Sequence, residues 1–565
     1  MHRIGELDRS GRARLLAALL LNALFLLITV LLVRVGFESN DDLTLAAFVD
    51  GQMAAPTAHI PYLNIVLGAL LKGIYQLLGQ GAPWHTLGQY ALLFAGFTAM
   101  TLVLDERLGI LRGSLVSLVL LLFFAVDAYT VINYTKTAAV CAVCGMLLAV
   151  QAAEDGGRRG ALLCGAALCL FGFLLRDMEA LPCLAIMAAL CLRRVWGLLF
   201  ADRGAEKGKR LVRFCLPFVG IVLLCAALWG VNKAAWSRAP WADYARFDAI
   251  RVAYSDYGRP AWEEMPEEYV ALGLSETDVK LLEEGNYYDP EVFSGETMQA
   301  ISEARDAKFP ARSWGECLGE FLDKCIPGFF INYGVYGLLL LLALWLCGGK
   351  REFRDFLALG FAALVFLICY LYLIRRGRYL VDRVDMGLFF AGAAVCAYLL
   401  DRERLAGERL LSALLVLLAL GTSFFLTRPS FRSADAEDFS AERAAVETLL
   451  ADTEHVYLAK LDTVSDRIYS PFETAGKGYW DRIVLLGGFD CGHPAIMDNL
   501  RLYGVENPFR DCIGNPRVYL IEDDVELTLR YLREHYDPAA EAEPVEPLSA
   551  ETGLSIYKIV RGGAA

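Results

Sequence analysis

Residues 14–42 read RLLAALLLNALFLLITVLLVRVGFESNDD, an apolar run that ends in a glutamate and two adjacent aspartates. A helix needs about 20 apolar residues to cross the hydrocarbon core of a bilayer, and the run through Val35 is long enough. The preceding Arg9, Arg12 and Arg14 favour a cytoplasmic N-terminus, and no convincing cleavage site of a signal peptide follows. This stretch therefore predicts a first transmembrane helix with an acidic loop at its outer end.

Apolar runs of this kind recur along most of the chain. The protein has 565 residues, 56% of them hydrophobic, and a mean hydropathy of +0.42. A soluble domain of this composition would expose larger apolar patches than monomers tolerate, whereas a lipid-facing exterior accommodates them. We therefore predict an all-α polytopic membrane bundle of about eleven transmembrane helices. The candidate spans are 15–36, 88–104, 113–127, 131–152, 160–175, 179–192, 211–231, 326–347, 356–374, 385–400 and 409–426.

Residues 60–79 are also long enough to cross a bilayer, but their pattern differs. Asn64, Gly68, Lys72 and Gln76 recur every fourth residue and form one stripe on a helix, which is typical of an interfacial or re-entrant helix. If this helix does not cross, most of the arginine- and lysine-rich loops face the cytoplasm, as the positive-inside rule requires. The protein is then a multi-pass protein of the plasma membrane. Its segments outside the membrane are 37–87, 232–325 and 427–565.

Two of these outside segments are large enough to fold. The 232–325 loop belongs to the transmembrane domain of residues 1–426 and is predicted to form short helices, with Ser275 and Ser294 as N-terminal caps. The tail, residues 427–565, alternates helical and strand patterns and predicts a small extracytoplasmic α/β domain. Its expected helices lie near 438–452 and 524–535, and its expected strands at 455–461, 482–488, 516–522 and 553–559.

Charge and cysteine content exclude several classes of function. The formal net charge of −13 argues against a nucleic-acid partner, which would require a basic face. Most of the fifteen cysteines lie in or beside apolar runs, where they pack as small hydrophobic side chains. Cys491 and Cys512 lie in a polar region and could form one disulfide outside the cell. His493 has no partners at metal-ligand spacing, so the sequence indicates neither a metal site nor a cofactor, although a divalent cation is possible.

The first outside loop contains the strongest candidate for chemistry, the acids of Glu38-Ser39-Asn40-Asp41-Asp42. Paired carboxylates at the outer end of a span can bind a hydroxyl group and remove its proton, so Asp41 and Asp42 are candidate catalytic bases. Glu38 and His59 are candidate substrate-binding residues. The alternative is an N-terminal cap, in which Asn40 or Asp41 starts a helix and Asp42 lies in its first turn. Both roles are compatible.

A first span, an acidic motif in the first outside loop, and a membrane-hugging helix that opens near His59-Ile60-Pro61-Tyr62 together resemble the GT-C (C-fold) membrane glycosyltransferases. The motif resemblance covers about residues 15–110, and the rest of the chain matches in layout. The whole chain is also similar to uncharacterised bacterial membrane proteins of surface-polysaccharide assembly. In the GT-C family, such loop acids serve as the catalytic base or hold the acceptor, and donors are usually polyprenyl-phosphate sugars. The other signatures of the family have no strong counterpart here.

Two groups of basic residues are predicted to face outwards. Arg375, Arg378 and Arg383 lie between two spans, against the charge bias of the other loops. Guanidinium groups suit phosphate, so these residues are candidates for holding the phosphate of a lipid donor. The alternatives are contact with anionic lipid head groups, or a topology in which this loop lies in the cytoplasm. Arg176 and Glu179 lie in a tight turn between two other spans. They either join this phosphate site or form an ordinary hairpin turn.

The sequence supports three functional hypotheses. The first is a glycosyltransferase that moves a hexosyl or pentosyl group from a lipid-linked donor to an envelope glycan or lipid acceptor, with Asp41 or Asp42 as base. The second is a polymerase or ligase of lipid-linked glycans. The third is a non-enzymatic scaffold or transporter, although the charges gather at the ends of spans rather than at mid-membrane depth, which counts against transport.

Overall fold

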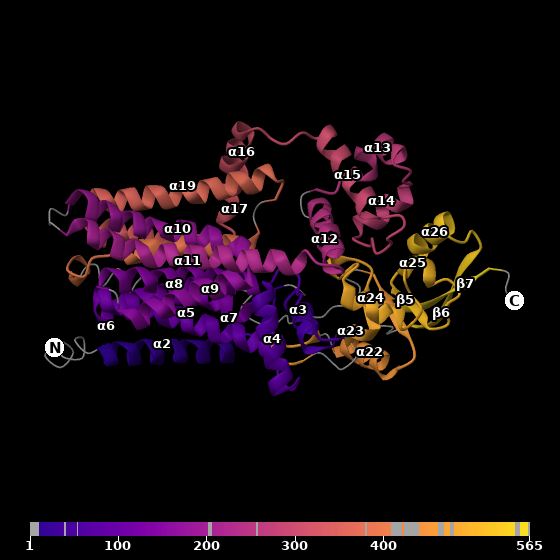
Figure 1. Ribbon diagram of the computed structural model, residues 1–565, viewed down its shortest axis with the longest axis horizontal. Coiled ribbons are helices and arrows are strands. Elements are labelled where there is room, and N and C mark those ends of the chain that lie inside the picture. Colours follow the sequence, from indigo (N-terminus) through magenta and orange to yellow (C-terminus); the bar gives the residue numbers. More distant parts are fainter. Residues whose placement is uncertain are drawn as a thin grey trace.

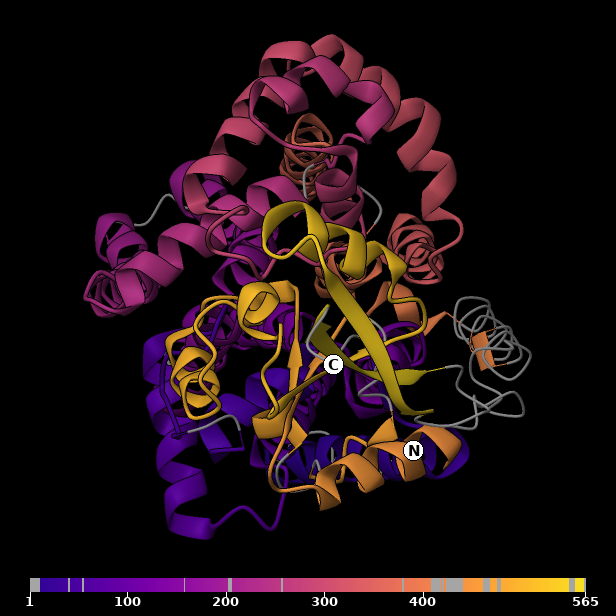
Figure 2. The same ribbon diagram turned by 90° about the vertical axis from the view of Figure 1, so that its right-hand side faces the viewer.

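The computed structural model shows an elongated molecule with a helical bundle at one end and the segments predicted to lie outside the membrane at the other (Figure 1). In the view from the tail end, the tail lies in front of the bundle (Figure 2). The described residues are 11–38, 41–52, 55–156, 158–201, 206–255, 258–378, 381–407, 418, 421–422, 440–460, 468–474, 479–547 and 554–562.

Within these described residues, seven helices are long and apolar enough to cross a membrane, or eight if a bent pair counts as one span. In the bent pair, the segment from Trp314 to Phe329 meets the helix Gly334–Gly348 at 93°. A π-helical turn, Leu121–Ala125, joins α6 and α7 into one span. The bundle helices are α2 Gly11–Leu32, α5 Trp84–Leu108, α6 Ile110–Leu120, α7 Val126–Thr130, α8 Tyr134–Glu154, α9 Arg159–Leu175, α10 Asp177–Trp196, α11 Lys207–Trp236, α17 Ile326–Phe329, α18 Gly334–Gly348, α19 Phe353–Arg375 and α20 Asp382–Tyr398.

Nine of the eleven predicted spans each coincide with one continuous helical segment. The tenth, 326–347, was predicted as a single span but contains the 93° bend between α17 and α18. The eleventh, 409–426, lies almost entirely outside the described residues. The predicted bundle is therefore present, but seven or eight spans meet the length that a bilayer requires. α9 and α20 contain 17 residues each, which is short for a span.

Ion pairs at the two ends of the bundle show how the helices alternate. At one end, the last turn of α5 meets the start of α9 and the last residue of α20, while the last turn of α10 meets the first turn of α19. These contacts therefore join helix ends that lie on the same side of the membrane when successive helices cross it in alternating directions. The contacts are Arg158–Glu106 at 2.6 Å, Arg107 Nε to the Tyr398 carbonyl at 3.0 Å, Arg193–Asp355 at 2.6 Å and Lys350–Asp401 at 3.2 Å.

This alternation of the helices holds only if α4, Ile65–Leu78, does not cross the membrane. Figure 1 shows it at the end of the bundle, steeply inclined to the long helices. Asn64 caps α4 through the Val66 N–H and donates to the Leu228 carbonyl at 3.2 Å, which attaches α4 to the end of α11. This placement is that of an interfacial helix.

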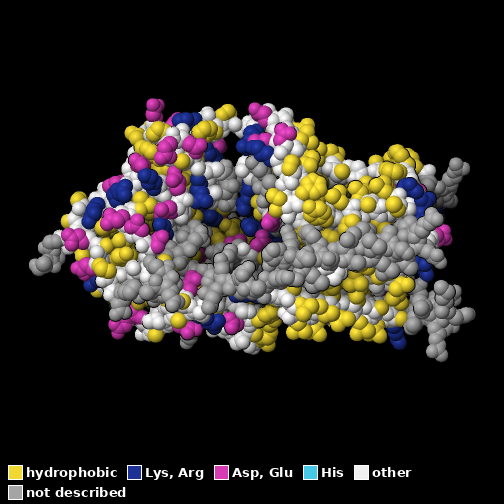
Figure 3. Space-filling model, turned by 180° about the vertical axis from the view of Figure 1, so that it is seen from behind, with side chains coloured by type: hydrophobic (Ala, Val, Ile, Leu, Met, Phe, Trp, Pro, Cys, Tyr) yellow, Lys and Arg dark blue, Asp and Glu magenta, His cyan; other side chains and the backbone are white. Residues whose placement is uncertain are grey.

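On the face that Figure 3 shows, apolar side chains gather over the described part of the bundle, whereas charged side chains gather over the other half of the molecule. Leu31 of α2, Leu216 of α11 and Leu364 of α19 are between 53 and 73% exposed. A continuous apolar exterior of this kind is stable when lipid covers it. The protein is therefore a multi-pass membrane protein.

The large outside loop folds into short helices, as predicted. They are α12 Trp241–Ser255, α13 Pro266–Ala271, α14 Glu276–Glu283, α15 Gly295–Lys308 and α16 Trp314–Glu320. Both predicted caps form: Ser275 Oγ accepts from the Asp278 N–H at 3.2 Å, and Ser294 Oγ accepts from the Thr297 N–H at 3.1 Å.

The tail contains a five-stranded mixed sheet in the order β4-β3-β5-β7-β6. The first three strands are parallel, and β7 and β6 add antiparallel. All four predicted strands form, and β6 was not predicted. Cys491 and Cys512 are both buried free thiols, so no disulfide joins them. The elements are β3 Val456–Ala459, β4 Ile483–Leu485, β5 Val518–Glu522, β6 Ala540–Pro547 and β7 Ser555–Arg561, with helices α22 Ser440–Ala451, α23 Tyr479–Arg482, α24 Pro494–Arg501, α25 Pro508–Asp511 and α26 Glu526–His535.

Two glycines of α4 provide a test of its packing. A Cβ at Gly68 would lie 2.1 Å from the Ala58 carbonyl oxygen, whereas a Cβ at Gly73 would meet nothing within 4 Å. We expect Gly68→Ala to destabilise the protein by about 1–3 kcal/mol through overpacking. Gly73→Ala should be neutral or stabilising by up to about 1 kcal/mol, because alanine is the better helix former. Thermal unfolding of the detergent-solubilised protein checks both, and equal unfolding temperatures would contradict the packing of α4 on this loop.

Candidate functional site

Charged and aromatic side chains from the tail-side ends of several bundle helices converge beside residues 37–87, the predicted first outside loop. We call this group the outer charge cluster. Its members come from the segment after α2, the start of α3 (Asp41–Asp50), the start of α7, the start of α8, the α9–α10 turn and the start of α20. They are Glu38, Asp41, Asp127, Tyr134, Lys136, Arg176, Glu179 and Arg383.

Lys136 is the best-connected member of the cluster. Its ammonium group contacts Glu38 at 2.8 Å, Asp127 at 2.7 Å and the Val131 carbonyl at 3.3 Å, so each of its three donors has an acceptor. A short parallel pairing of β1, Gly36–Phe37, with β2, Val131–Ile132, holds the Glu38 backbone beside this group. The Glu38 N–H extends the pairing to the Ile132 carbonyl at 3.2 Å.

Two carboxylates share the single ammonium group of Lys136. Glu38 is largely buried, and this burial raises its pKa above the usual range, although Lys136 opposes the shift. Arg383 adds a second, longer contact to Glu38, at 3.8 Å. Glu38 is therefore held between a lysine and an arginine from two different helices.

Arg176 occupies the other part of the cluster, between two tyrosines. It donates to the Tyr134 hydroxyl, and its Cζ lies 5.0 Å from the Tyr134 ring centroid and 5.4 Å from that of Tyr62. Burial disfavours its charged form, but Tyr134, Asp41 and Glu179 outweigh that effect and raise the Arg176 pKa. Asp41, only partly buried, is thus within electrostatic reach of this guanidinium group.

The two adjacent aspartates have different surroundings. The Asp42 side chain is fully buried: its carboxylate accepts from Gln89 Nε2 at 2.7 Å and from the Tyr134 N–H at 3.2 Å, and lies 3.2 Å from His85 Nε2. It joins α3 to α5 and to the first turn of α8. Both aspartates lie in the first turn of α3, where the capping alternative expected Asp42 alone, with Asn40 or Asp41 as the cap. Asn40 lies outside the described residues.

Apart from the buried Asp42, the predicted site residues divide into three groups. Glu38, Asp41, Arg176, Glu179 and Arg383 belong to the outer charge cluster. Two others have different neighbours: Arg375 donates to the Arg312 carbonyl at 2.6 Å, and Arg378 follows α19, with its N–H bonded to the Leu373 carbonyl at 3.0 Å.

His59 forms a third group, with the tail. Its ring stacks on Trp241 at 4.0 Å between centroids, and its carbonyl oxygen lies 3.1 Å from His493 Nε2. His493 in turn packs 4.2 Å from the Phe48 ring. His59 therefore contributes to the contact between the first loop, the large loop and the tail.

Sequence reasoning missed Asp127 and gave Lys136 no role beyond an outside turn. A signal was available, because Asp127 ends an otherwise apolar span, and charges at such positions are rare unless they are paired. The partner could not be read from the sequence, since it depends on the pairing of β1 with β2.

Three potential metal ligands meet between α14 and α26, with the ligand atoms of Asp278, Glu534 and His535 all within 4.8 Å of one another. The structure accounts for each without a cation: His535 Nε2 lies 2.7 Å from Asp278, while Glu534 accepts from Ser275 at 2.7 Å and from Thr277 at 2.6 Å. We interpret this group as a polar contact between the large loop and the tail.

No protein-family model and no curated protein matches this chain. Among solved structures, it is similar to ArnT from Cupriavidus metallidurans in the apo state (TM-score 0.39, 12% identity, 95% of this chain and 97% of that chain). The same protein bound to undecaprenyl phosphate gives a TM-score of 0.34 at 13% identity, covering 96% and 97%. The Archaeoglobus fulgidus oligosaccharyltransferase in complex with zinc and sulfate gives 0.38 at 11%, covering 96% and 73%. Both proteins are GT-C membrane glycosyltransferases. Scores this low carry no inference about activity.

Two histidines of the tail predict opposite responses to pH. Burial lowers the pKa of His493 to about 3, so its contribution to stability is complete above the unfolded pKa of about 6.5 and is lost as the pH falls below it. The hydrogen bond with Asp278 raises the pKa of His535, so its contribution is complete below pH 6.5 and is lost as the pH rises.

We therefore expect the tail to lose up to about 1.4 kcal/mol of stability per pH unit below pH 6 through His493. His493→Asn should flatten this acid slope, whereas His535→Asn should change the slope only above pH 6.5. Urea unfolding followed by tryptophan fluorescence between pH 4.5 and 8 measures both. An unchanged acid slope in His493→Asn would contradict the buried neutral imidazole.

Proposed function

We propose that this protein is a membrane glycosyltransferase that moves a sugar from a polyprenyl-phosphate donor to an envelope glycan or lipid acceptor on the outer face. The observation that carries the proposal is the convergence of first-loop acids with Arg176 and Arg383 in the outer charge cluster. These residues come from helices far apart in the sequence. Deprotonation of the acceptor hydroxyl and departure of the phosphate need a carboxylate and a cation in one place.

Asp41 is the better candidate for the catalytic base. Its carboxylate is partly accessible and lies within the electrostatic influence of Arg176, whereas that of Asp42 is fully buried among donors. Asp41 would remove the proton of the acceptor hydroxyl as the acceptor oxygen bonds to the anomeric carbon. Asp42 would act as a positioning residue, because it holds α3 against α5 and α8.

Arg176 and Arg383 are candidates for stabilising the leaving phosphate. As the bond from the anomeric carbon to the phosphate oxygen breaks, negative charge develops on polyprenyl phosphate, and a guanidinium group can donate two parallel hydrogen bonds to it. Lys136 is less suited to this role, since all three of its donors are already bonded.

The distribution of charge argues against transport. The buried charged residues of the described bundle helices lie in first or last turns, such as Lys136 of α8, Glu179 of α10 and Asp355 of α19. A transporter would need ionisable groups near the middle of the membrane. A polymerase or ligase of lipid-linked glycans is the alternative within the same class of enzymes, and it does not need the first-loop carboxylates.

The test is release of polyprenyl phosphate from a panel of polyprenyl-phosphate hexoses and pentoses in membranes that contain the protein. We expect Asp41→Asn to lower the rate by a factor of about 10²–10⁴, the usual contribution of a general base. Asp42→Asn should lower both the rate and the unfolding temperature, because it weakens a buried hydrogen-bond network.

Glu276→Gln is the matched control, since Glu276 is also an acid in the first turn of an outside helix and is exposed. It should retain full activity. Wild-type rates in both Asp41→Asn and Asp42→Asn would exclude the first-loop mechanism and favour the polymerase or ligase alternative. No release of polyprenyl phosphate by wild-type protein from any donor would contradict the proposal as a whole.

A further inference from the structure

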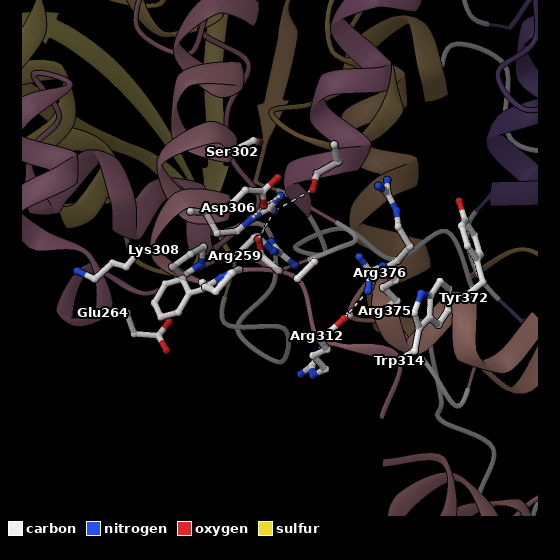
Figure 4. A pocket seen from close by; sticks show the side chains of 18 residues that line it. Arg259, Glu264, Ser302, Asp306, Lys308, Arg312, Trp314, Tyr372, Arg375 and Arg376 are labelled. Carbon is white, nitrogen blue, oxygen red and sulfur yellow. Dashed lines mark hydrogen bonds and ion pairs between the residues drawn. The ribbon is translucent and has the colours of Figure 1, made fainter. Parts of the chain in front are cut away.

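A cleft of about 1170 Å³ lies between the end of α15, the chain that follows it and the end of α19 (Figure 4). Two acidic side chains, Glu264 and Asp306, line it, so cations outnumber acids on its walls. The six cationic residues are Arg259, Arg305, Lys308, Arg312, Arg375 and Arg376. None of them belongs to the outer charge cluster.

Backbone carbonyl groups hold several of these guanidinium groups in place. Arg375 donates to the Arg312 carbonyl at 2.6 Å, and Arg312 donates to the Ile374 carbonyl at 3.3 Å, so each arginine fixes the backbone that carries the other. On the opposite wall, Arg305 donates to the Ala253 carbonyl at 3.0 Å. A carbonyl oxygen orients a guanidinium group without neutralising its charge, so the cleft is preorganised for an anion.

Acidic partners neutralise only part of this charge. Asp306 pairs with Arg305 at 2.8 Å, Glu320 with Arg312 at 3.3 Å, and Glu268 with Lys308 at 2.9 Å. In the part of the chain that the structure describes, no acid lies within ion-pair distance of Arg259 or Arg375. Arg259 donates to the Glu283 carbonyl at 3.2 Å. Two guanidinium groups without a paired carboxylate suit the oxygens of a phosphate.

The cleft opens at the depth of lipid head groups. Arg375 is the last residue of α19, one of the helices long enough to span a membrane, and its Cζ lies 4.8 Å from the Trp314 ring centroid. Trp314 and Tyr372 line the cleft and are 57% and 51% exposed. Exposed tryptophan and tyrosine at the end of a span mark the membrane–water interface.

We infer that this cleft binds the phosphate-bearing head group of a lipid in the leaflet on the tail side, at a site separate from the outer charge cluster. Its volume exceeds that of a single phosphate and fits a diphosphate or a phosphate with an attached polar group. The inference stands independently of the proposed glycosyl transfer, since it rests on the charge, preorganisation and depth of the cleft.

The test is equilibrium binding of short-chain phosphatidylglycerol to the full-length protein in neutral detergent, followed by tryptophan fluorescence. Short-chain phosphatidylcholine and soluble pyrophosphate serve as comparison probes. We expect phosphatidylglycerol to bind at least tenfold more tightly than phosphatidylcholine. The double variant Arg259→Gln, Arg375→Gln should weaken its binding at least tenfold, because each hydrogen bond from a charged group contributes about that factor.

Arg517→Gln is the matched control. Arg517 of the tail also donates to a backbone carbonyl, that of Leu502 at 2.8 Å, and stands 4.7 Å from a ring centroid, that of Tyr503. It should leave binding unchanged. Arg259→Gln alone, which loses only one carbonyl contact, tests the site if the double variant fails to fold.

Equal binding of the two lipids, or wild-type affinity in the folded variants, would overturn the inference. Tight binding of pyrophosphate together with no preference between the lipids would also overturn it, by assigning the cleft to a soluble phosphate. Weak pyrophosphate binding together with the expected lipid preference would support it. Since the readout is binding, failure of glycosyl transfer does not affect the result.

Discussion

Lys136 brings a full positive charge to a position where its side chain is only 3% exposed, and the carboxylates of Glu38 and Asp127 compensate it there. A buried ammonium group is tolerated only when it is paired and hydrogen-bonded. Removing the lysine would take away the main compensation of two acids at the membrane edge and leave Glu38 with only its longer contact to Arg383, which typically costs about 3–5 kcal/mol. This triad ties the exit of α2, the start of α7 and the start of α8 into one unit that includes Glu38, the first acid of the loop.

The same requirement explains why the polar contacts gather at the two ends of the bundle. Hydrocarbon cannot solvate a charge, so charged residues of spanning helices lie at helix ends and pair with one another. Ion pairs at both ends therefore show which helix ends lie on the same side of the membrane. They are Arg158–Glu106 at one end and Lys136–Glu38 at the other. These pairings require α4 to stay on the tail side without crossing the membrane, as its inclination to the long helices also indicates.

Short-range patterns were the part of this structure that the sequence could predict. Helix positions, the Ser275 and Ser294 caps and four strands of the tail each depend on neighbouring residues. The strand β6, AEAEPVEP, was missed because its composition disfavours strands, and it forms by pairing along β7 at the edge of the sheet.

The chemistry of the two aspartates could not be predicted from sequence, because successive residues on a helix point about 100° apart. Asp41 and Asp42 are adjacent residues of the same type, so the sequence does not distinguish them. Only the docking of α3 on α5 decides which carboxylate is buried. The arginines divide for a similar reason. Arg375 and Arg383 lie eight positions apart, yet one ends α19 and the other starts α20, so they face different partners.

The tail also reaches the outer charge cluster, through a chain of hydrogen bonds. The Gly488 N–H of the tail donates to the Tyr287 hydroxyl at 3.0 Å, and Arg251 donates to that hydroxyl at 3.4 Å and to Tyr62 at 2.8 Å. Tyr62 in turn lies against Arg176 of the cluster. Arg251 is buried and paired with Asp248 at 2.6 Å, so neither it nor Tyr62 can shift without breaking charged hydrogen bonds. The position of Arg176 therefore depends on the docked tail, which makes the tail a structural part of the site rather than an appendage to the bundle.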